Sequence, residues 1–309
     1  MKMLAKQSHQ IDDYPTRLIE EERSARKDPV VWTKWSPEAP LTQMQAQSYA
    51  DDGYLVLKNL FSKAEVTALQ AVSAALRSGQ TEVDEQDKIT EPSSNAIRTV
   101  FRLGSHNALF DRLARDSRIA GIVQHLLGDD LYLHQSRLNY KPGYTGKEFY
   151  WHSDFETWHA EDGMPRMRAI SASILLSDND ALNGPLMLIP GSHKTFVACA
   201  GGTPEKNHES SLKKQEIGVP SHDSLTEMAD THGIDYAAGA AGTVILFDSN
   251  TLHGSNGNIT PFARSNAFFV YNAWSNRLQA PFAAKAPRPE FLSERAPTAP
   301  IKIETGSLL

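Results

Sequence analysis

Three residues of types that bind metals are placed where they could form one site. His152 and Asp154 are two positions apart, so a strand through them would place both side chains on one face. His253 lies far along the chain and supplies a third ligand. Two histidines and one carboxylate that leave other coordination positions open are the ligand set of non-haem iron(II) oxygenases. A His-x-Asp pair is common by itself, so the residues that accompany it decide the interpretation.

A cation follows the second histidine at a position that suits a second substrate. Arg264 precedes the apolar run 267–271, so we expect its guanidinium at the mouth of a strand. A guanidinium binds a carboxylate through two parallel hydrogen bonds. Arg264 therefore suits the distal carboxylate of 2-oxoglutarate.

Composition bounds the class of protein. The 309 residues are 40% hydrophobic and 22% charged, which is typical of a soluble globular protein with one large core. The net charge is −6 and no basic cluster is longer than a pair such as Lys213-Lys214, so we expect neither nucleic acid nor a membrane as partner. Cys199 is the single cysteine, which excludes an internal disulfide and favours a reducing compartment. Without an apolar segment of about 18 residues, we expect a cytoplasmic protein.

Capping residues and glycines predict three helices, over residues 41–52, 62–79 and 116–128, each ended by a glycine. Ser62 and Glu65 form a capping box at the start of the second helix. We expect these helices to be scaffold.

Strands dominate after residue 130. They are expected over residues 54–57, 131–141, 168–176, 186–189, 242–248 and 264–274, with the strand at 242–248 delivering His253. In 131–141 the odd-numbered face carries two leucines, Leu131 and Leu133, and then Gln135, Arg137 and Asn139. If the leucines point inward, so do the polar side chains, and contact with a ligand would offset the cost of burying them. An outward-facing polar strand is the alternative.

The remaining segments are polar. Residues 80–95 are expected to be a loop and 195–231 a long connection, and either could be solvated surface or a mobile lid. Short strands with long connections and two distant ligand positions describe a mainly β fold, a double-stranded β-helix (jelly roll) with flanking α-helices. We expect an N-terminal arm over 1–40, one domain over 41–291 with its jelly-roll core at about 95–275, and a C-terminal tail over 292–309.

The set of His152, Asp154, His253 and Arg264 resembles iron(II)- and 2-oxoglutarate-dependent dioxygenases of the phytanoyl-CoA hydroxylase type. The segments Asn-Gly-Pro at 183–185 and Ile-Pro-Gly-Ser-His at 189–193 are similar to that family too. The seventeen residues 149–165 resemble the signature of the ectoine hydroxylases within it. The resemblance extends from about residue 12 to residue 291.

The resemblance implies hydroxylation of ectoine at ring carbon 5, which gives the osmoprotectant 5-hydroxyectoine. It implies that His152, Asp154 and His253 hold Fe(II), and that O2 and 2-oxoglutarate are consumed. The residues implied to bind 2-oxoglutarate are Arg264, Ser255, Asn139, Arg137 and Phe149. A homodimer is also implied.

Ectoine carries a delocalised cation and a carboxylate, so its pocket needs an aromatic face and a donor. Trp158 suits the cation, and the resemblance points to Gln135 and Arg288 for the remaining contacts. Glu148 could pair with the cation or belong to the surface. Phe247 is a further candidate, although such a residue is usually core.

Two alternatives stay open. A dioxygenase of the same fold could hydroxylate another small amino-acid-like substrate. A cupin-like sensor could bind a metal and a ligand without turnover, and oxygen uptake that needs iron and 2-oxoglutarate would exclude it.

Overall fold

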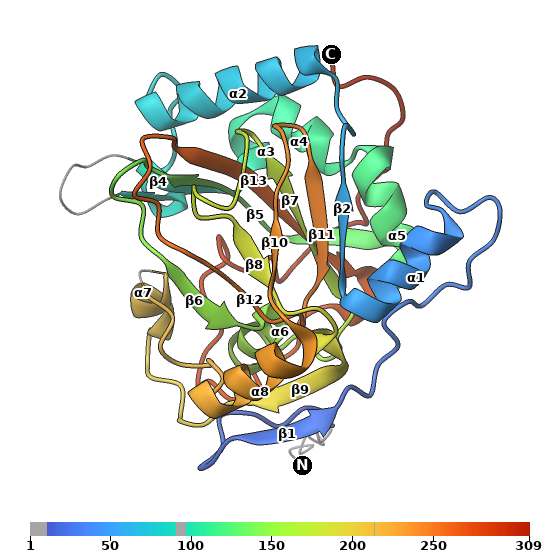
Figure 1. Cartoon of the computed structure of the whole chain (residues 1–309), viewed down its shortest axis with the longest axis vertical. Coiled ribbons are helices and arrows are strands. Elements are labelled where there is room, and N and C mark those ends of the chain that lie inside the picture. The colour runs from blue at the N-terminus through green and yellow to red at the C-terminus, as the bar shows by residue number, and fades with distance from the viewer. Residues whose placement is uncertain (1–10, 91–96, 213) are drawn as a thin grey trace, which may run out of the picture.

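The computed structural model describes residues 11–90, 97–212 and 214–309, and its core consists of two antiparallel sheets (Figure 1). The strands of the larger sheet lie in the order β2 (Tyr54–Leu57), β11 (Val244–Asp248), β7 (Ala169–Leu175), β13 (Arg264–Ala273), β5 (Leu131–Lys141), β4 (Ile97–Phe101) and β3 (Lys88–Thr90). The smaller sheet has the order β10 (Asp235–Ala237), β8 (Leu186–Leu188), β12 (His253–Ser255) and β6 (Phe149–His152). Phe247 and Phe268 of the larger sheet pack against Leu188 of the smaller one. This is the expected mainly β jelly roll.

Helices cover the other face of the larger sheet. They are α1 (Gln43–Asp52), α2 (Lys63–Ser78), α3 (Leu103–His106), α4 (Ala108–Ala114) and α5 (Ile122–Leu127). Leu69 of α2, Leu113 of α4 and Val123 of α5 are fully buried in one cluster with Val244 and Phe269 of the sheet. The apolar stripe of each helix is therefore used in packing, which leaves the opposite face of the sheet for the site.

The helix ends follow the local rules expected of them. Ser62 and Glu65 cap α2 reciprocally, and Gly79 ends it in the left-handed conformation (φ 75°). Asp116 caps a π-helical turn, Ser117–Gly121, that continues into α5. These predictions are confirmed because each depends on residues within one turn of the helix end.

The β5 strand contains a bulge that strict alternation did not predict. Gln135 pairs with Val270 and Leu133 pairs with Tyr271, so His134 is an extra residue between two consecutive partners. Such a bulge reverses the alternation of side chains along the strand. Gln135 therefore points to the face opposite to Leu133.

The bulge corrects the reasoning about the odd-numbered face. Leu131 and Leu133 pack against the cluster under the helices, whereas Gln135, Arg137 and Asn139 line the cavity between the sheets. The polar side chains face a pocket as expected, but the leucines do not accompany them.

Two connections contain more regular structure than expected. Residues 195–231 hold β9 (Thr195–Ala198), α7 (Asn207–Ser211) and nearly all of α8 (His222–His232), and 80–95 holds the 3-10 turn Glu85–Asp87 and the whole of β3. Residues 91–95 of the expected loop lie outside the described residues. The short elements among these, such as α7 and β3, have too few residues for periodicity to reveal. The 11-residue α8, which the Ser221 side chain caps, was missed.

Both terminal segments pack on the body. β1 (Glu22–Ala25) pairs with β9, and Tyr14 is fully buried. At the other end of the chain, Leu308 is buried and its backbone N–H donates to Glu65. The remaining short elements are α6 (Asp154–Thr157), the π-helical turn Trp158–Asp162, and the 3-10 turns Ser192–Lys194 and Trp274–Asn276. No helix in the described part of the chain is both long and apolar enough to cross a membrane.

Candidate active site

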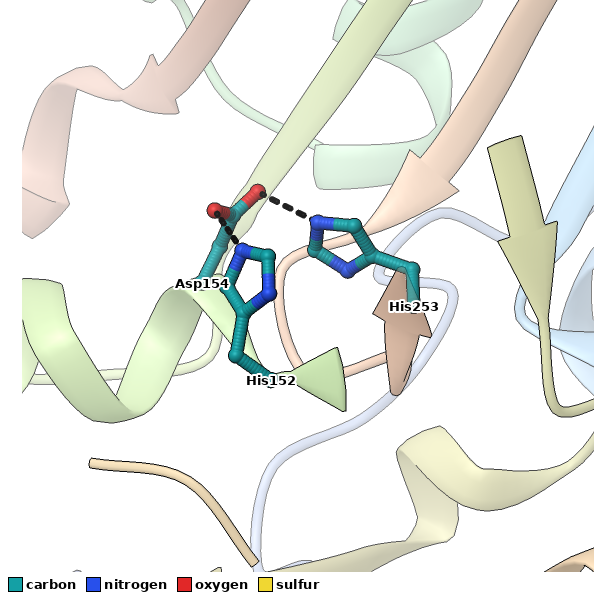
Figure 2. Close-up of side chains that lie close together, drawn as sticks. All are labelled: His152, Asp154 and His253. Carbon is teal, nitrogen blue, oxygen red and sulfur yellow. Dashed lines mark ion pairs between the residues drawn. The ribbon is translucent and has the colours of Figure 1, made fainter. Parts of the chain in front are cut away.

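Three side chains from two strands and one helix converge at one end of the smaller sheet (Figure 2). His152 ends β6 and His253 begins β12, and the two are direct partners across these strands. Asp154 begins α6. Its carboxylate oxygens lie 3.7 Å from His152 Nε2 and 3.9 Å from His253 Nε2. One ligand atom from each residue lies within 4.8 Å of the others, so a single ion could contact all three.

Two expectations about how these ligands are positioned were wrong. His152 and Asp154 do not share a strand, because β6 ends at His152 and the chain turns into α6. β11 does not carry His253, because β11 ends at Asp248 in the larger sheet and β12 belongs to the smaller one. The convergence therefore comes from two chain turns and not from alternation along one strand.

Backbone carbonyls orient both imidazole rings. His152 Nδ1 lies 2.8 Å from the carbonyl of Tyr150, and His253 Nδ1 lies 2.9 Å from that of Thr251. A carbonyl only accepts hydrogen bonds, so each Nδ1 carries the hydrogen and each Nε2 offers a lone pair to the centre.

The charges at this centre suit a cation. Burial by itself raises the pKa of Asp154, but His253 and His152 outweigh it and hold that pKa well below its usual value. Burial lowers the pKa of His253 to about 4, and His152 adds to the shift. At neutral pH the carboxylate is charged and His253 is neutral, which is the state in which they bind metals. Ser171 Oγ donates to Asp154 at 3.1 Å and holds the carboxylate in place.

The donor set fits iron(II). Two imidazole nitrogens and one carboxylate oxygen on one side of an ion leave its other side open toward a cavity, as in non-haem iron(II) oxygenases. His152, Asp154 and His253 would hold that metal.

Paired residues of three neighbouring strands form the floor of the cavity. Arg137 of β5 lies opposite Phe268 of β13 on one side and Phe101 of β4 on the other. Lys141 lies opposite Arg264, four residue pairs further along the same two strands. All five residues line the cavity, because residues paired across strands project from the same face.

Arg264 is a buried cation without a counterion. Among the described residues none forms an ion pair with it, and its Nη1 has no hydrogen-bond acceptor. Burial lowers its pKa to about 10. A buried charge is costly unless it is paired. We therefore expect Arg264 to bind an anion in the cavity. Ser255 and Asn139 line the same cavity as Arg264.

Arg137 is a second buried guanidinium on the cavity floor. It stacks over the Phe268 ring, 4.7 Å from its centroid, and donates to the side-chain oxygen of Gln135. The Gln135 amide in turn donates to the carbonyl of Leu292 at 2.7 Å. Burial lowers the pKa of Arg137. This chain of contacts ties the floor to the C-terminal segment.

The opposite wall holds a second polar group around a buried carboxylate. Arg288 makes two parallel hydrogen bonds to Asp162, at 2.8 and 2.5 Å. His134 Nε2 lies 3.2 Å from the same carboxylate, and its ring meets the Trp158 indole edge to face at 5.1 Å. Asp162 therefore positions a guanidinium on the cavity wall and lies next to the histidine that contacts the Trp158 ring.

Comparison with known proteins identifies the family. The sequence profile of the phytanoyl-CoA dioxygenase (PhyH) family matches residues 49–266. The chain belongs to this family. It is 53% identical over 299 residues to the ectoine dioxygenase of Sphingopyxis alaskensis, covering 96% of this chain and 98% of that protein. It is 54% identical over 301 residues to the ectoine dioxygenase of Stutzerimonas stutzeri, with 97% and 100% covered.

Solved structures of similar proteins have the same fold. EctD from S. alaskensis with 2-oxoglutarate and 5-hydroxyectoine superposes with a TM-score of 0.89 at 50% identity, covering 97% of this chain and 100% of that one. EctD from S. alaskensis with bound Fe gives the same TM-score and coverage at 49% identity. The carbocyclase SnoK, at 18% identity and a TM-score of 0.61, shares the fold alone.

Most residues expected at the site line the cavity of this family member. These are Gln135, Arg137, Asn139, Glu148, Phe149, His152, Asp154, Trp158, His253, Ser255, Arg264 and Arg288. Glu148 is exposed at the mouth of the cavity, and the Phe149 ring lies 5.0 Å from that of His152. Phe247 is the exception. It lies outside the lining with its ring 4.8 Å from that of His253, because β11 directs it into the core between the sheets.

The structure adds residues that the sequence analysis missed. Lys141 continues the alternation of Gln135, Arg137 and Asn139, so its position was available from the pattern. Leu292 and Gln215 also line the cavity, but they come from irregular segments. No local pattern marks such residues.

Proposed function

We propose that the protein catalyses the iron(II)- and 2-oxoglutarate-dependent hydroxylation of ectoine to 5-hydroxyectoine, with release of succinate and CO2. The observation that carries the proposal is a buried His152, Asp154 and His253 centre that shares one cavity with the unpaired guanidinium of Arg264. The close similarity to ectoine dioxygenases, and to an EctD structure with 2-oxoglutarate and 5-hydroxyectoine, supports the choice of substrate.

The cosubstrate would lie between the metal centre and Arg264. Arg264 binds its distal carboxylate through two hydrogen bonds, assisted by Ser255 and Asn139. Arg137 and Phe149 border the part nearer the metal. Bound iron(II), with O2 and 2-oxoglutarate, supplies the oxidising chemistry, and the protein orients the reactants and excludes water.

The substrate would occupy the wall that carries Trp158 and Arg288. The indole face attracts the delocalised cation of ectoine, worth about 0.5–2 kcal/mol. Arg288, held by Asp162, is directed to the carboxylate of ectoine, and Gln135 offers a further hydrogen-bonding group. Glu148 at the mouth adds a negative charge that favours the entry of the cation.

Product analysis tests the proposal. The protein is loaded with Fe(II), incubated with ectoine, 2-oxoglutarate and air, and examined by mass spectrometry. We expect one added oxygen on ectoine and an equal amount of succinate. Succinate without hydroxylated ectoine would indicate a dioxygenase for another small amino-acid-like substrate. If the iron-loaded protein forms neither succinate nor hydroxylated ectoine, that result contradicts the proposal and favours a sensor.

We also propose a cytoplasmic homodimer, in which residues 41–291 form one catalytic domain between the N-terminal arm and the C-terminal tail. The unpaired, buried Cys199 is in keeping with a reducing compartment. Sedimentation equilibrium of the purified protein tests the dimer, and a mass of one chain would contradict it.

A further inference from the structure

A second cation lies beside Arg264 in the same cavity. Lys141 is the last residue of β5 and the direct cross-strand partner of Arg264 at the start of β13. Its Nζ donates to Ser255 Oγ at 3.0 Å and to the carbonyl of Asn256. Lysine and arginine thus approach one corner of the cavity from adjacent strands.

This pair of cations lacks an anion. Within the described ranges of the chain, no aspartate or glutamate forms an ion pair with Lys141 or with Arg264. Burial lowers the pKa of Lys141 to about 7, the charge of Arg264 adds to the shift, and Glu148 opposes it. Like charges directly opposite each other on neighbouring strands are destabilising. A carboxylate bound between Lys141 and Arg264 would attract both cations and offset their mutual repulsion.

The hydrogen bond from Lys141 also directs the Ser255 hydroxyl. Because Ser255 Oγ accepts from Lys141 Nζ, its own hydrogen remains to be donated elsewhere. Ser255 and Arg264 line the same cavity. The ammonium, the hydroxyl and the guanidinium can therefore donate to one bound carboxylate.

Two glycines confine the lysine side chain. A Cβ on Gly146 would collide with Lys141 Cγ, and a Cβ on Gly184 would lie 3.2 Å from Lys141 Cδ. Gly184 has a φ of 71° and belongs to the Asn-Gly-Pro segment at 183–185 that the sequence analysis singled out. The aliphatic part of Lys141 thus runs through a slot between two loops, so its ammonium is positioned and not free on the surface.

We propose that Lys141 is a cosubstrate-binding residue: it is the second cation for the distal carboxylate of 2-oxoglutarate and holds Ser255 in the donating orientation. The inference rests on the proposed use of 2-oxoglutarate. It deepens that proposal by assigning a residue and a segment, 183–185, that the expected site did not include.

The test compares two ligands in three proteins. Binding to the Fe(II)-loaded protein is measured without oxygen, from the absorbance that a 2-oxo acid develops on iron. The ligands are 2-oxoglutarate and 2-oxopentanoate, which has the same carbon chain but no distal carboxylate. The proteins are the wild type, Lys141→Met, which keeps the apolar stem, and Lys147→Met, a matched control that removes a charge exposed near the cavity mouth.

We expect Lys141→Met to weaken 2-oxoglutarate binding about 10- to 100-fold, the effect of one charge-assisted hydrogen bond. Binding of 2-oxopentanoate should stay unchanged, and Lys147→Met should leave both affinities as in the wild type. Lys141→Arg, which keeps the charge, should recover part of the loss. An equal loss for both ligands would show a structural effect only, and no loss for either would overturn the proposal.

Dependence on pH gives a second readout. Wild-type affinity for 2-oxoglutarate should fall as the pH rises from about 6 to 8.5, because Lys141 loses its proton beside Arg264 and Glu148. The Lys141→Met protein should lack that part of the dependence, and an identical dependence in both would contradict the assignment. If the wild type binds 2-oxopentanoate more tightly than 2-oxoglutarate, the proposed cosubstrate is wrong and this inference fails with it.

Discussion

Replacing Arg264 by methionine should make the ligand-free protein more stable and at the same time remove its affinity for 2-oxoglutarate. Burial lowers the pKa of Arg264 from 12.5 to about 10. At about 1.4 kcal/mol per unit of pKa, this shift means that the folded protein destabilises the charged form of Arg264 by roughly 3 kcal/mol. The group is protonated at pH 7 in both folded and unfolded chains, so the penalty acts in full there.

Methionine has a similar length and carries no charge, so it removes the penalty while keeping part of the packing. We expect the free energy of unfolding to rise by about 1–3 kcal/mol, which is a few degrees in Tm for a chain of this size. Loss of two charge-assisted hydrogen bonds should weaken 2-oxoglutarate binding about 100-fold or more. Thermal unfolding of the ligand-free protein and anaerobic titration measure the two effects separately.

Arg17→Met is the matched control for stability. Arg17 is also buried, but its guanidinium lies 2.6 Å from Glu156 and 3.1 Å from Glu161. Its removal leaves two buried carboxylates without a cation, although Thr16 still donates to Glu156 and Asn207 to Glu161, and should lower the free energy of unfolding by about 3–5 kcal/mol. If Arg264→Met destabilises the protein as Arg17→Met does, Arg264 has a partner within the fold and the reasoning is refuted.

Three further predictions concern the carboxylates of Asp154, Asp162 and Glu65. Asp154→Ala should lose bound iron in metal analysis and form no succinate, and normal turnover would exclude the proposed metal centre. Asp162→Asn should raise KM for ectoine about 10-fold or more and leave KM for 2-oxoglutarate unchanged, because Arg288, on the wall proposed for ectoine, loses its ionic partner; steady-state kinetics with each substrate varied would show it. The bond from Arg118 lowers the pKa of Glu65 to about 2, below its ordinary 4.5, so its stabilising effect is complete above pH 4.5 and is lost as the pH falls toward 2. Glu65→Gln should therefore cost about 1–3 kcal/mol at pH 7 in chemical denaturation, with a difference from the wild type that shrinks below pH 4.

The sequence by itself determined those features that depend on near neighbours. Ser62 and Glu65 set the start of α2 because a capping box involves residues three apart. The chemical types of His152, Asp154, His253 and Arg264 pointed to a metal and a cosubstrate, since such ligands are recognised by type before their geometry is known. The contiguous segment 149–165, with 183–185 and 189–193, added the resemblance to a family.

Only the tertiary structure decided how the site is assembled. The bulge at His134 separates the leucines of β5 from its polar residues, and it arises from pairing with β13, a strand more than a hundred residues away. Phe247 belongs to the core because β8 covers its face of the sheet. Lys141 and Arg264 become adjacent cations only when their strands pair. Such contacts join residues that are remote in the chain, so no local propensity specifies them, and they form only when burial of both sheets fixes the register.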